Sequence, residues 1–122
     1  MPRTREQPDR EERILNEIVV DAYGRSERAL AWYYYLQDNL QFPLMAQCRQ
    51  KRSISPLKVG ETMQVVGMAD EDDCMSEVFV FVKYARSKLG VPLSQLECQT
   101  NDEPARQAIS DWHYWVARGY EY

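Results

Sequence analysis

Residues 78–84, VFVFVKY, decide how this chain folds. Valine, phenylalanine and tyrosine are enriched in strands, and here they form an unbroken run. Residues 62–68, TMQVVGM, predict a second strand, and residues 42–48 predict a third. The middle of the chain is therefore expected to form a sheet.

The segment after this run continues the sheet. Residues 85–90 predict a turn, and residues 91–99, VPLSQLECQ, predict a short strand, a tight turn near residues 92–95 and another short strand. Four or five short strands with turn signals indicate a small, strongly bent sheet or barrel. Their order is similar to that of an SH3-like barrel, with VPLSQLE as the one-turn 3₁₀ connector before the last strand.

Helices are expected on both sides of this sheet. Asp9 is a candidate N-cap, and Gly24 stands where a C-terminal glycine cap would end the first helix. Ser26 is a candidate N-cap for a second helix, and Thr100 for the last one. Apolar residues recur with helical spacing after each of these caps.

The predicted fold class is α+β, a small SH3-like β-barrel flanked by N-terminal and C-terminal helices. We expect a single domain over residues 1–122, with a helical region at 9–40, the barrel at 42–99 and the C-terminal helix at 101–118. A chain of 122 residues can bury a core of its own without disulfides.

Composition excludes several classes of protein. The formal charge of −4 lacks the basic excess of a nucleic-acid binder. Cys48, Cys74, Cys98 and His113 do not have the spacing of a zinc site. Apolar runs stay well short of a membrane span and the N-terminus has no signal-peptide core, so we expect a cytoplasmic protein with no membrane partner.

Asp38 is the first candidate metal ligand. It lies in residues 29–43, ALAWYYYLQDNLQFP, where the pattern predicts the end of a helix. The free carbonyls at a helix C-terminus favour cations, so a carboxylate among them is unfavourable unless a positive group joins it. Carbonyl and carboxylate oxygens together suit calcium. The alternative is a solvated Asp in a fraying last turn, with the aromatic run serving as core.

The second candidate is the acidic run Asp70, Glu71, Asp72 and Asp73, in the turn between two predicted strands. Four adjacent carboxylates repel one another unless a counter-ion joins them. Calcium selects flexible, oxygen-rich loops, but the glycine and the final glutamate of an EF-hand loop are both missing here. The alternative is a solvated, acidic hairpin tip.

Enzymatic motifs are missing from the chain. It has no nucleophile elbow, P-loop, metalloprotease or dinucleotide-binding pattern. His113 stands two residues from Asp111, which hints at acid–base chemistry, although a lone histidine in an aromatic-rich helix is more typical of packing. We therefore expect that the protein is not an enzyme.

Four blocks of sequence carry a resemblance to a known family. They are AWYYYLQDNLQFP at 31–43, ISPLKVGETMQVVGMA at 54–69, VPLSQLE at 91–97 and DWHYWVARGYEY at 111–122. Together they resemble the CcbP family of bacterial calcium-binding proteins. The resemblance implies a small, acidic, cytosolic protein that binds Ca²⁺ without EF-hands, has a buffering or sensing role in signalling, and uses Asp38 as a calcium ligand.

The sequence-based hypothesis is thus a non-EF-hand, cytosolic calcium buffer or sensor that binds the ion through surface carboxylates. Asp38 enters through the resemblance as well as through its position, and the run from Asp70 to Asp73 enters through its charge alone. The alternative is an SH3-like protein-interaction module, in which exposed Trp and Tyr side chains bind a protein partner and calcium is incidental.

Overall fold

A computed structural model describes residues 6–20, 22 and 24–119, so the predicted tail at 120–122 lies outside the described residues. The helical elements are α1 (Pro8–Glu17), α2 (Arg25–Asn39) and α3 (Glu103–Ala117), with the 3₁₀ turns η1 (Glu71–Cys74) and η2 (Leu93–Gln95). The strands are β1 (Leu44–Cys48), β2 (Thr62–Met68), β3 (Phe79–Tyr84), β4 (Ser87–Pro92) and β5 (Leu96–Gln99). This element content confirms the α+β class.

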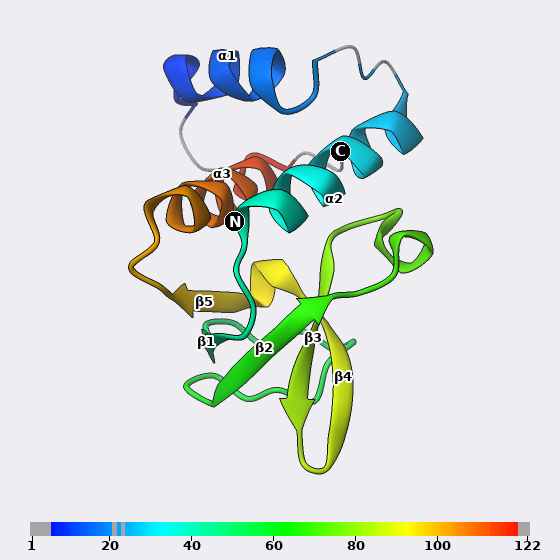
Figure 1. Cartoon of the computed structure of the whole chain (residues 1–122), viewed down its shortest axis with the longest axis vertical. Coiled ribbons are helices and arrows are strands. Elements are labelled where there is room, and N and C mark those ends of the chain that lie inside the picture. Colours follow the sequence, from blue (N-terminus) through cyan, green and yellow to red (C-terminus); the bar gives the residue numbers. More distant parts are fainter. Residues whose placement is uncertain (1–5, 21, 23, 120–122) are drawn as a thin grey trace.

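The helices and the sheet form separate layers. Figure 1 shows α2 and α3 next to the sheet, with α1 lying across them on the far side from the strands. The sheet is antiparallel throughout, in the order β4-β3-β2-β1-β5. In the described part of the chain, no helix is long and apolar enough to cross a membrane.

The sheet is open, so the predicted SH3-like barrel is not confirmed. Its edges are β4 and β5, and no hydrogen-bonded pairing joins these two described strands. They are nevertheless consecutive in the chain, connected only by the predicted 3₁₀ turn, η2. A chain that passes from one edge of the sheet to the other in so few residues requires a strongly curled sheet.

The strand β3 uses both of its faces. Val80 and Val82 are fully buried in the main core, as is Val78 just before the strand. Because side chains alternate along a strand, Phe79 and Phe81 point to the other face. There they pack against a second, smaller cluster, which consists of Tyr33, Ala69 and Cys74.

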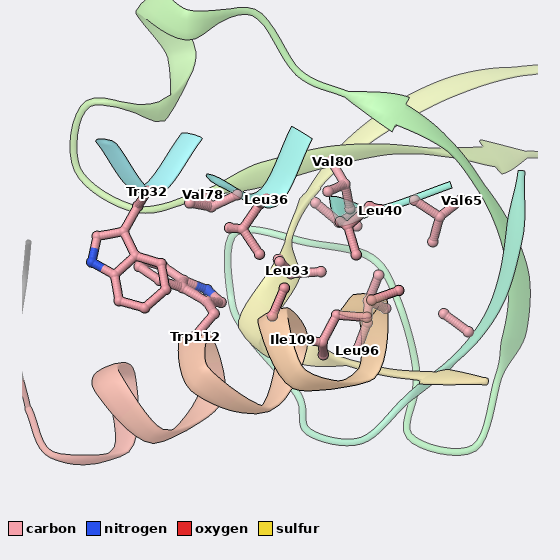
Figure 2. Packing of buried hydrophobic residues seen from close by; sticks show 14 of the residues in the cluster. Trp32, Leu36, Leu40, Val65, Val78, Val80, Leu93, Leu96, Ile109 and Trp112 are labelled. Atoms are coloured by element: carbon pink, nitrogen blue, oxygen red, sulfur yellow. The ribbon is translucent and has the colours of Figure 1, made fainter. Parts of the chain in front are cut away.

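Two tryptophans join the helices above the sheet. The ring centroids of Trp32 in α2 and Trp112 in α3 are 5.1 Å apart, in an edge-on arrangement. Figure 2 shows both rings beside the aliphatic side chains that the sheet and α3 contribute to the core. Trp115 is buried as well, which corrects the expectation that exposed tryptophans bind a partner.

The ends of the first two helices differ from the prediction. Asp9 lies inside α1, because Pro8 occupies the first turn and Gln7 is the N-cap. Helix α1 ends at Glu17, where the following Ile18 and Val19 turn into the core. Gly24 is therefore the N-cap of α2 and not the C-terminal cap of α1, and it takes the place expected for Ser26.

Helix α3 is capped by Asp102, not by Thr100. The Asp102 Oδ2 accepts a hydrogen bond from the Ala105 backbone N–H at 3.1 Å. The Thr100 hydroxyl accepts from the Asp102 N–H instead, at 3.1 Å. Thr100 thus holds the capping residue in place, and Asp102 satisfies one of the helix's free N–H groups.

Residues 85–90, predicted as a turn, belong largely to strand β4. The turn itself is short, since Tyr84 pairs with Ser87 and Ala85 adopts a left-handed conformation with φ of 56°. Arg86, Ser87 and Lys88 are polar and exposed, and β4 is an edge strand of the sheet. Charged side chains are common at such edges, so apolar patterning does not reveal them.

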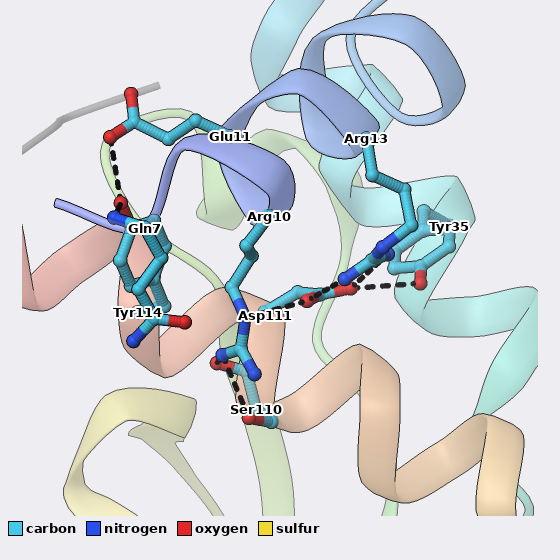
Figure 3. Close-up of polar contacts among 8 residues, drawn as sticks. All are labelled: Gln7, Arg10, Glu11, Arg13, Tyr35, Ser110, Asp111 and Tyr114. Atoms are coloured by element: carbon cyan, nitrogen blue, oxygen red, sulfur yellow. Dashed lines mark hydrogen bonds and ion pairs between the residues drawn. The ribbon is translucent and has the colours of Figure 1, made fainter.

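A buried carboxylate ties the three helices together (Figure 3). Asp111 of α3 is fully buried and accepts two hydrogen bonds from Arg13 of α1, at 2.9 and 2.6 Å. Tyr35 of α2 donates a third, at 3.2 Å, and the Arg10 Nε lies 3.8 Å away. Burial raises the pKa of Tyr35 to about 12, with the Asp111 charge adding to the effect. Charged, bidentate pairs of this kind are the strong hydrogen bonds.

We expect Asp111→Asn to lower the free energy of unfolding by about 3 kcal/mol. This value is at the lower end of the range for breaking a buried ion pair, because Arg13 is partly exposed. Urea denaturation measures this loss. Asp9→Asn removes the same charge from an exposed position in α1 and should change stability by less than about 0.5 kcal/mol. Equal losses in the two variants would contradict a special role for Asp111.

Candidate metal-binding site

Asp38 occupies the next-to-last position of α2, with its side chain exposed. The last turn of this helix contains no basic residue. Within the described part of the chain, no side chain forms an ion pair with Asp38. The predicted juxtaposition of a carboxylate with a helix C-terminus is therefore present, and no cation from the described chain relieves it.

Some of the neighbouring carbonyls are already satisfied. The Leu40 N–H donates to the Leu36 carbonyl at 2.9 Å, and the Asn39 side-chain amide donates to the Tyr35 carbonyl at 2.8 Å. No described N–H group outside the helix donates to the carbonyls of Gln37 or Asp38. Oxygen atoms suited to a hard cation therefore accompany the Asp38 carboxylate.

The acidic run forms an anchored turn. Asp70 is the N-cap of η1, and the other three acidic residues lie within it, with all four side chains exposed. The Asp73 N–H closes the turn on the Asp70 carbonyl at 2.9 Å. Behind it, the buried Cys74 sulfur accepts from the Phe79 N–H at 3.4 Å. The backbone of the acidic turn is thus held while its carboxylates face solvent.

Two tyrosines of α2 connect the acidic turn to the helix that carries Asp38. The Tyr33 hydroxyl donates to the Ala69 carbonyl at 2.7 Å, and the Tyr34 hydroxyl donates to the Glu71 carboxylate. Tyr34 and Asp38 are four residues apart, so they share one face of the helix. The helix face that carries Asp38 therefore also contacts the acidic turn, through Tyr34.

The sequence did not predict this contact between α2 and the acidic turn. It indicated Asp38 and the run from Asp70 to Asp73 as two separate acidic features. The spacing of Tyr34 and Asp38 is visible in the sequence as a helical i, i+4 pair. The contact of Tyr34 with Glu71 is not visible, because it joins residues separated by 37 positions. Only the packing of η1 against α2 reveals it.

The tyrosines respond to the negative charge around them. The hydrogen bond to Glu71 raises the pKa of Tyr34. Burial raises the pKa of Tyr33, and the charges of Glu71 and Asp70 add to it. The carboxylates of the acidic turn thus contribute to both shifts, and the same negative field attracts a cation.

The chemistry of these donors fits calcium, but their side chains do not form a ready-made cage. Every donor is an oxygen from Asp, Glu or the backbone, which is the ligand type of a hard cation. Among the described residues, no three His, Cys, Asp or Glu side chains lie close enough together to hold a metal ion. Binding at Asp38 or at the acidic turn would therefore draw on backbone carbonyls and water as further ligands.

His113 and Asp111 do not form an acid–base pair. They are two residues apart on α3 and so do not face each other. Asp111 is held by Arg13, and no hydrogen bond joins it to His113 among the described residues. Burial lowers the pKa of His113 to about 4, so the ring is neutral at physiological pH.

Comparison with known proteins assigns the chain to a family. The model of the CcbP family, described as calcium binding, matches residues 12–116. The chain belongs to the CcbP family of calcium-binding proteins. The resemblance seen in the sequence is thus confirmed, and the family is a calcium-binding family, not an enzyme family.

Two solved structures are similar to this CcbP family member over nearly the whole chain. The crystal structure of Anabaena CcbP is 38% identical, covers 100% of both chains and has a TM-score of 0.85. A calcium-binding protein solved in its calcium-binding form is also 38% identical, covers 96% of both chains and has a TM-score of 0.84. No curated protein matches the sequence.

The low pKa of His113 predicts how stability depends on pH. Between pH 4 and 6.5 the unfolded chain binds a proton at this residue that the folded chain does not, so stability falls as the pH is lowered through this window. We expect His113→Gln to remove about 2 kcal/mol of the loss that the wild type suffers between pH 7.5 and pH 5. Urea denaturation at both pH values measures the loss of stability. If the wild type and His113→Gln lose the same free energy of unfolding between pH 7.5 and pH 5, the low pKa of His113 is refuted.

Proposed function

We propose that this protein is a cytoplasmic, non-EF-hand calcium buffer or sensor, and that Asp38, Asp70, Glu71, Asp72 and Asp73 are its calcium-binding residues. Membership of a calcium-binding family supports the ion, and the 38% identity to a protein solved in its calcium-binding form supports it further. The residues are assigned from their placement in this chain.

One observation carries the assignment of residues. Helix α2 ends on an exposed carboxylate, and the same face of that helix holds the acidic turn through the Tyr34 hydroxyl. The acidic turn is thereby held against the helix that also carries Asp38, in a protein whose formal charge is only −4. A divalent cation would relieve the mutual repulsion among the carboxylates of this turn.

Asp38 and the acidic turn differ in the ligand atoms that they present to a calcium ion. Asp38 stands beside unbonded carbonyls at a helix C-terminus, where the helix dipole also attracts a cation. The acidic turn offers mainly carboxylates, which are exposed to solvent and to screening by salt. We therefore assign the tighter site to Asp38 and a weaker one to the acidic turn, with an affinity in the sub-millimolar to millimolar range.

The sheet acts as the support for these sites. Its curl and its 3₁₀ connector favour an SH3-like arrangement, which we retain as part of the proposal. The alternative of a protein-interaction module loses part of its support, because the tryptophans that it expected at the surface are buried, although Tyr34 is exposed.

Calorimetric titration with calcium tests the function. The wild type should bind, and calcium should raise its unfolding temperature in a way that EDTA reverses, since a ligand of the native state stabilises it by mass action. We expect Asp38→Asn to weaken binding at the tighter site at least about tenfold, or about 1.4 kcal/mol, with α2 intact or slightly more stable.

Glu17→Gln is the matched control for Asp38→Asn. It removes one negative charge from an exposed position at the end of α1, away from both acidic features. Its calcium affinity should stay close to that of the wild type. If the two variants lose the same affinity, only net charge matters, and Asp38 is no ligand.

The salt dependence of calcium binding should distinguish the exposed acidic turn from the tighter site at Asp38. At low ionic strength, Asp72→Asn/Asp73→Asn should lose a weak binding step that the wild type shows. At physiological salt this step should be much weaker even in the wild type, because charges are screened over about 8 Å. A double variant that keeps every binding step at low salt would show that the turn is only a solvated acidic segment.

A further inference from the structure

A cleft between β5 and α3 lies apart from the acidic residues discussed above. It encloses about 660 Å³, and its walls come from the start of α1, the residue that follows β1, strand β5 and the first half of α3. Ligand pockets for small molecules commonly have volumes of about 300 to 1,000 Å³. The cleft therefore has room for an organic molecule and not only for a single ion.

Three arginines from three different parts of the chain line this cleft: Arg10, Arg49 and Arg106. Arg10 reaches across from α1 and donates to the carbonyl and the hydroxyl of Ser110, as Figure 3 shows. Arg49 is anchored by its Nε, which donates to the Ser94 carbonyl at 2.9 Å. Arg106 is on the exposed face of α3.

The terminal nitrogens of Arg49 are available to a ligand. Within the described part of the chain, neither of them has a bond or an ion pair to a protein group. The backbone N–H of Arg49 is also fixed, by the Gln95 carbonyl at 2.8 Å. A guanidinium that is anchored at one end and unbonded at the other is a pre-positioned donor for an oxyanion.

Three arginines and two glutamates line the cleft, so the glutamates offset only part of its positive charge. Glu103 lies 3.9 Å from Arg106 in a solvent-exposed pair, and pairs of this kind are weak. Glu97 is exposed on β5. His113 is neutral at physiological pH, so it adds no charge of either sign. The cleft thus carries a positive excess in a protein that is acidic overall.

We propose that this cleft binds a small phosphorylated organic molecule, with Arg49 and Arg106 contacting the phosphate and Arg10 shaping the wall through Ser110. Guanidinium groups match the geometry of phosphate oxygens, and two of them here come from different elements that line the cleft. The volume leaves space for the organic part beside the phosphate. The proposal is independent of the calcium site, whose ligands are all oxygens on another part of the fold.

NMR titration of the calcium-free, ¹⁵N-labelled protein tests this assignment in a buffer without chelator. The probes are AMP and glucose 6-phosphate, each compared with its unphosphorylated parent and with inorganic phosphate. We expect the phosphorylated probes to shift the amides of β5 and the first half of α3. Arg49→Gln/Arg106→Gln should weaken this binding at least about tenfold.

Lys83→Gln/Arg86→Gln is the matched control, since it removes the same charge from the exposed β3–β4 hairpin. It should bind the probes as the wild type does, and Arg106→Gln alone, at an exposed position, should weaken binding without loss of folding. Binding of neither phosphorylated probe would overturn the proposal. So would equal weakening in both double variants, or inorganic phosphate binding as tightly as AMP.

Discussion

The buried carboxylate of Asp111 is the constraint on which the arrangement of the helices depends. It has no contact with solvent, so its charge must be met inside the protein, and Arg13 and Tyr35 meet it from two other helices. Leaving any of these groups unpaired would be costly, which restricts how α1 and α2 can lie on α3. The position of α2 matters most, because α2 carries Asp38.

The three consecutive tyrosines of α2 show how one helix serves three purposes. Successive residues of a helix point about 100° apart, so neighbours in sequence face different surroundings. Tyr35 faces the buried carboxylate, Tyr33 reaches the Ala69 carbonyl in the smaller core, and Tyr34 meets Glu71 at the surface. The run that identifies the family in sequence is thus also the part of the structure that joins the core to the acidic turn.

The acidic region at α2 and η1 and the arginine-lined cleft beside α3 differ in the sign of their charge and in how their side chains are held. At Asp38 and in the acidic turn beside α2, the carboxylates are exposed, which suits a cation that completes its own shell with water. In the cleft beside α3, an arginine is anchored at its Nε and presents its remaining donors. One small sheet supports both regions because it is strongly curled. The curl brings η2 next to Arg49, the residue that follows β1.

The sequence by itself determined the class of the fold and the strands β1, β2, β3 and β5, because strand residues such as Val80 and Val82 are apolar and β-branched, as buried strand residues usually are. It also pointed to Asp38 and to the family, since both depend on short local patterns. The first part of strand β4 and the caps Gln7 and Asp102 were not predicted, because the polar start of an edge strand shows no apolar pattern and several neighbouring residues can each act as a helix cap. Only the tertiary structure decided that Tyr34 meets Glu71 and that Arg13 meets Asp111, because these contacts join residues far apart in the chain and depend on how the helices pack.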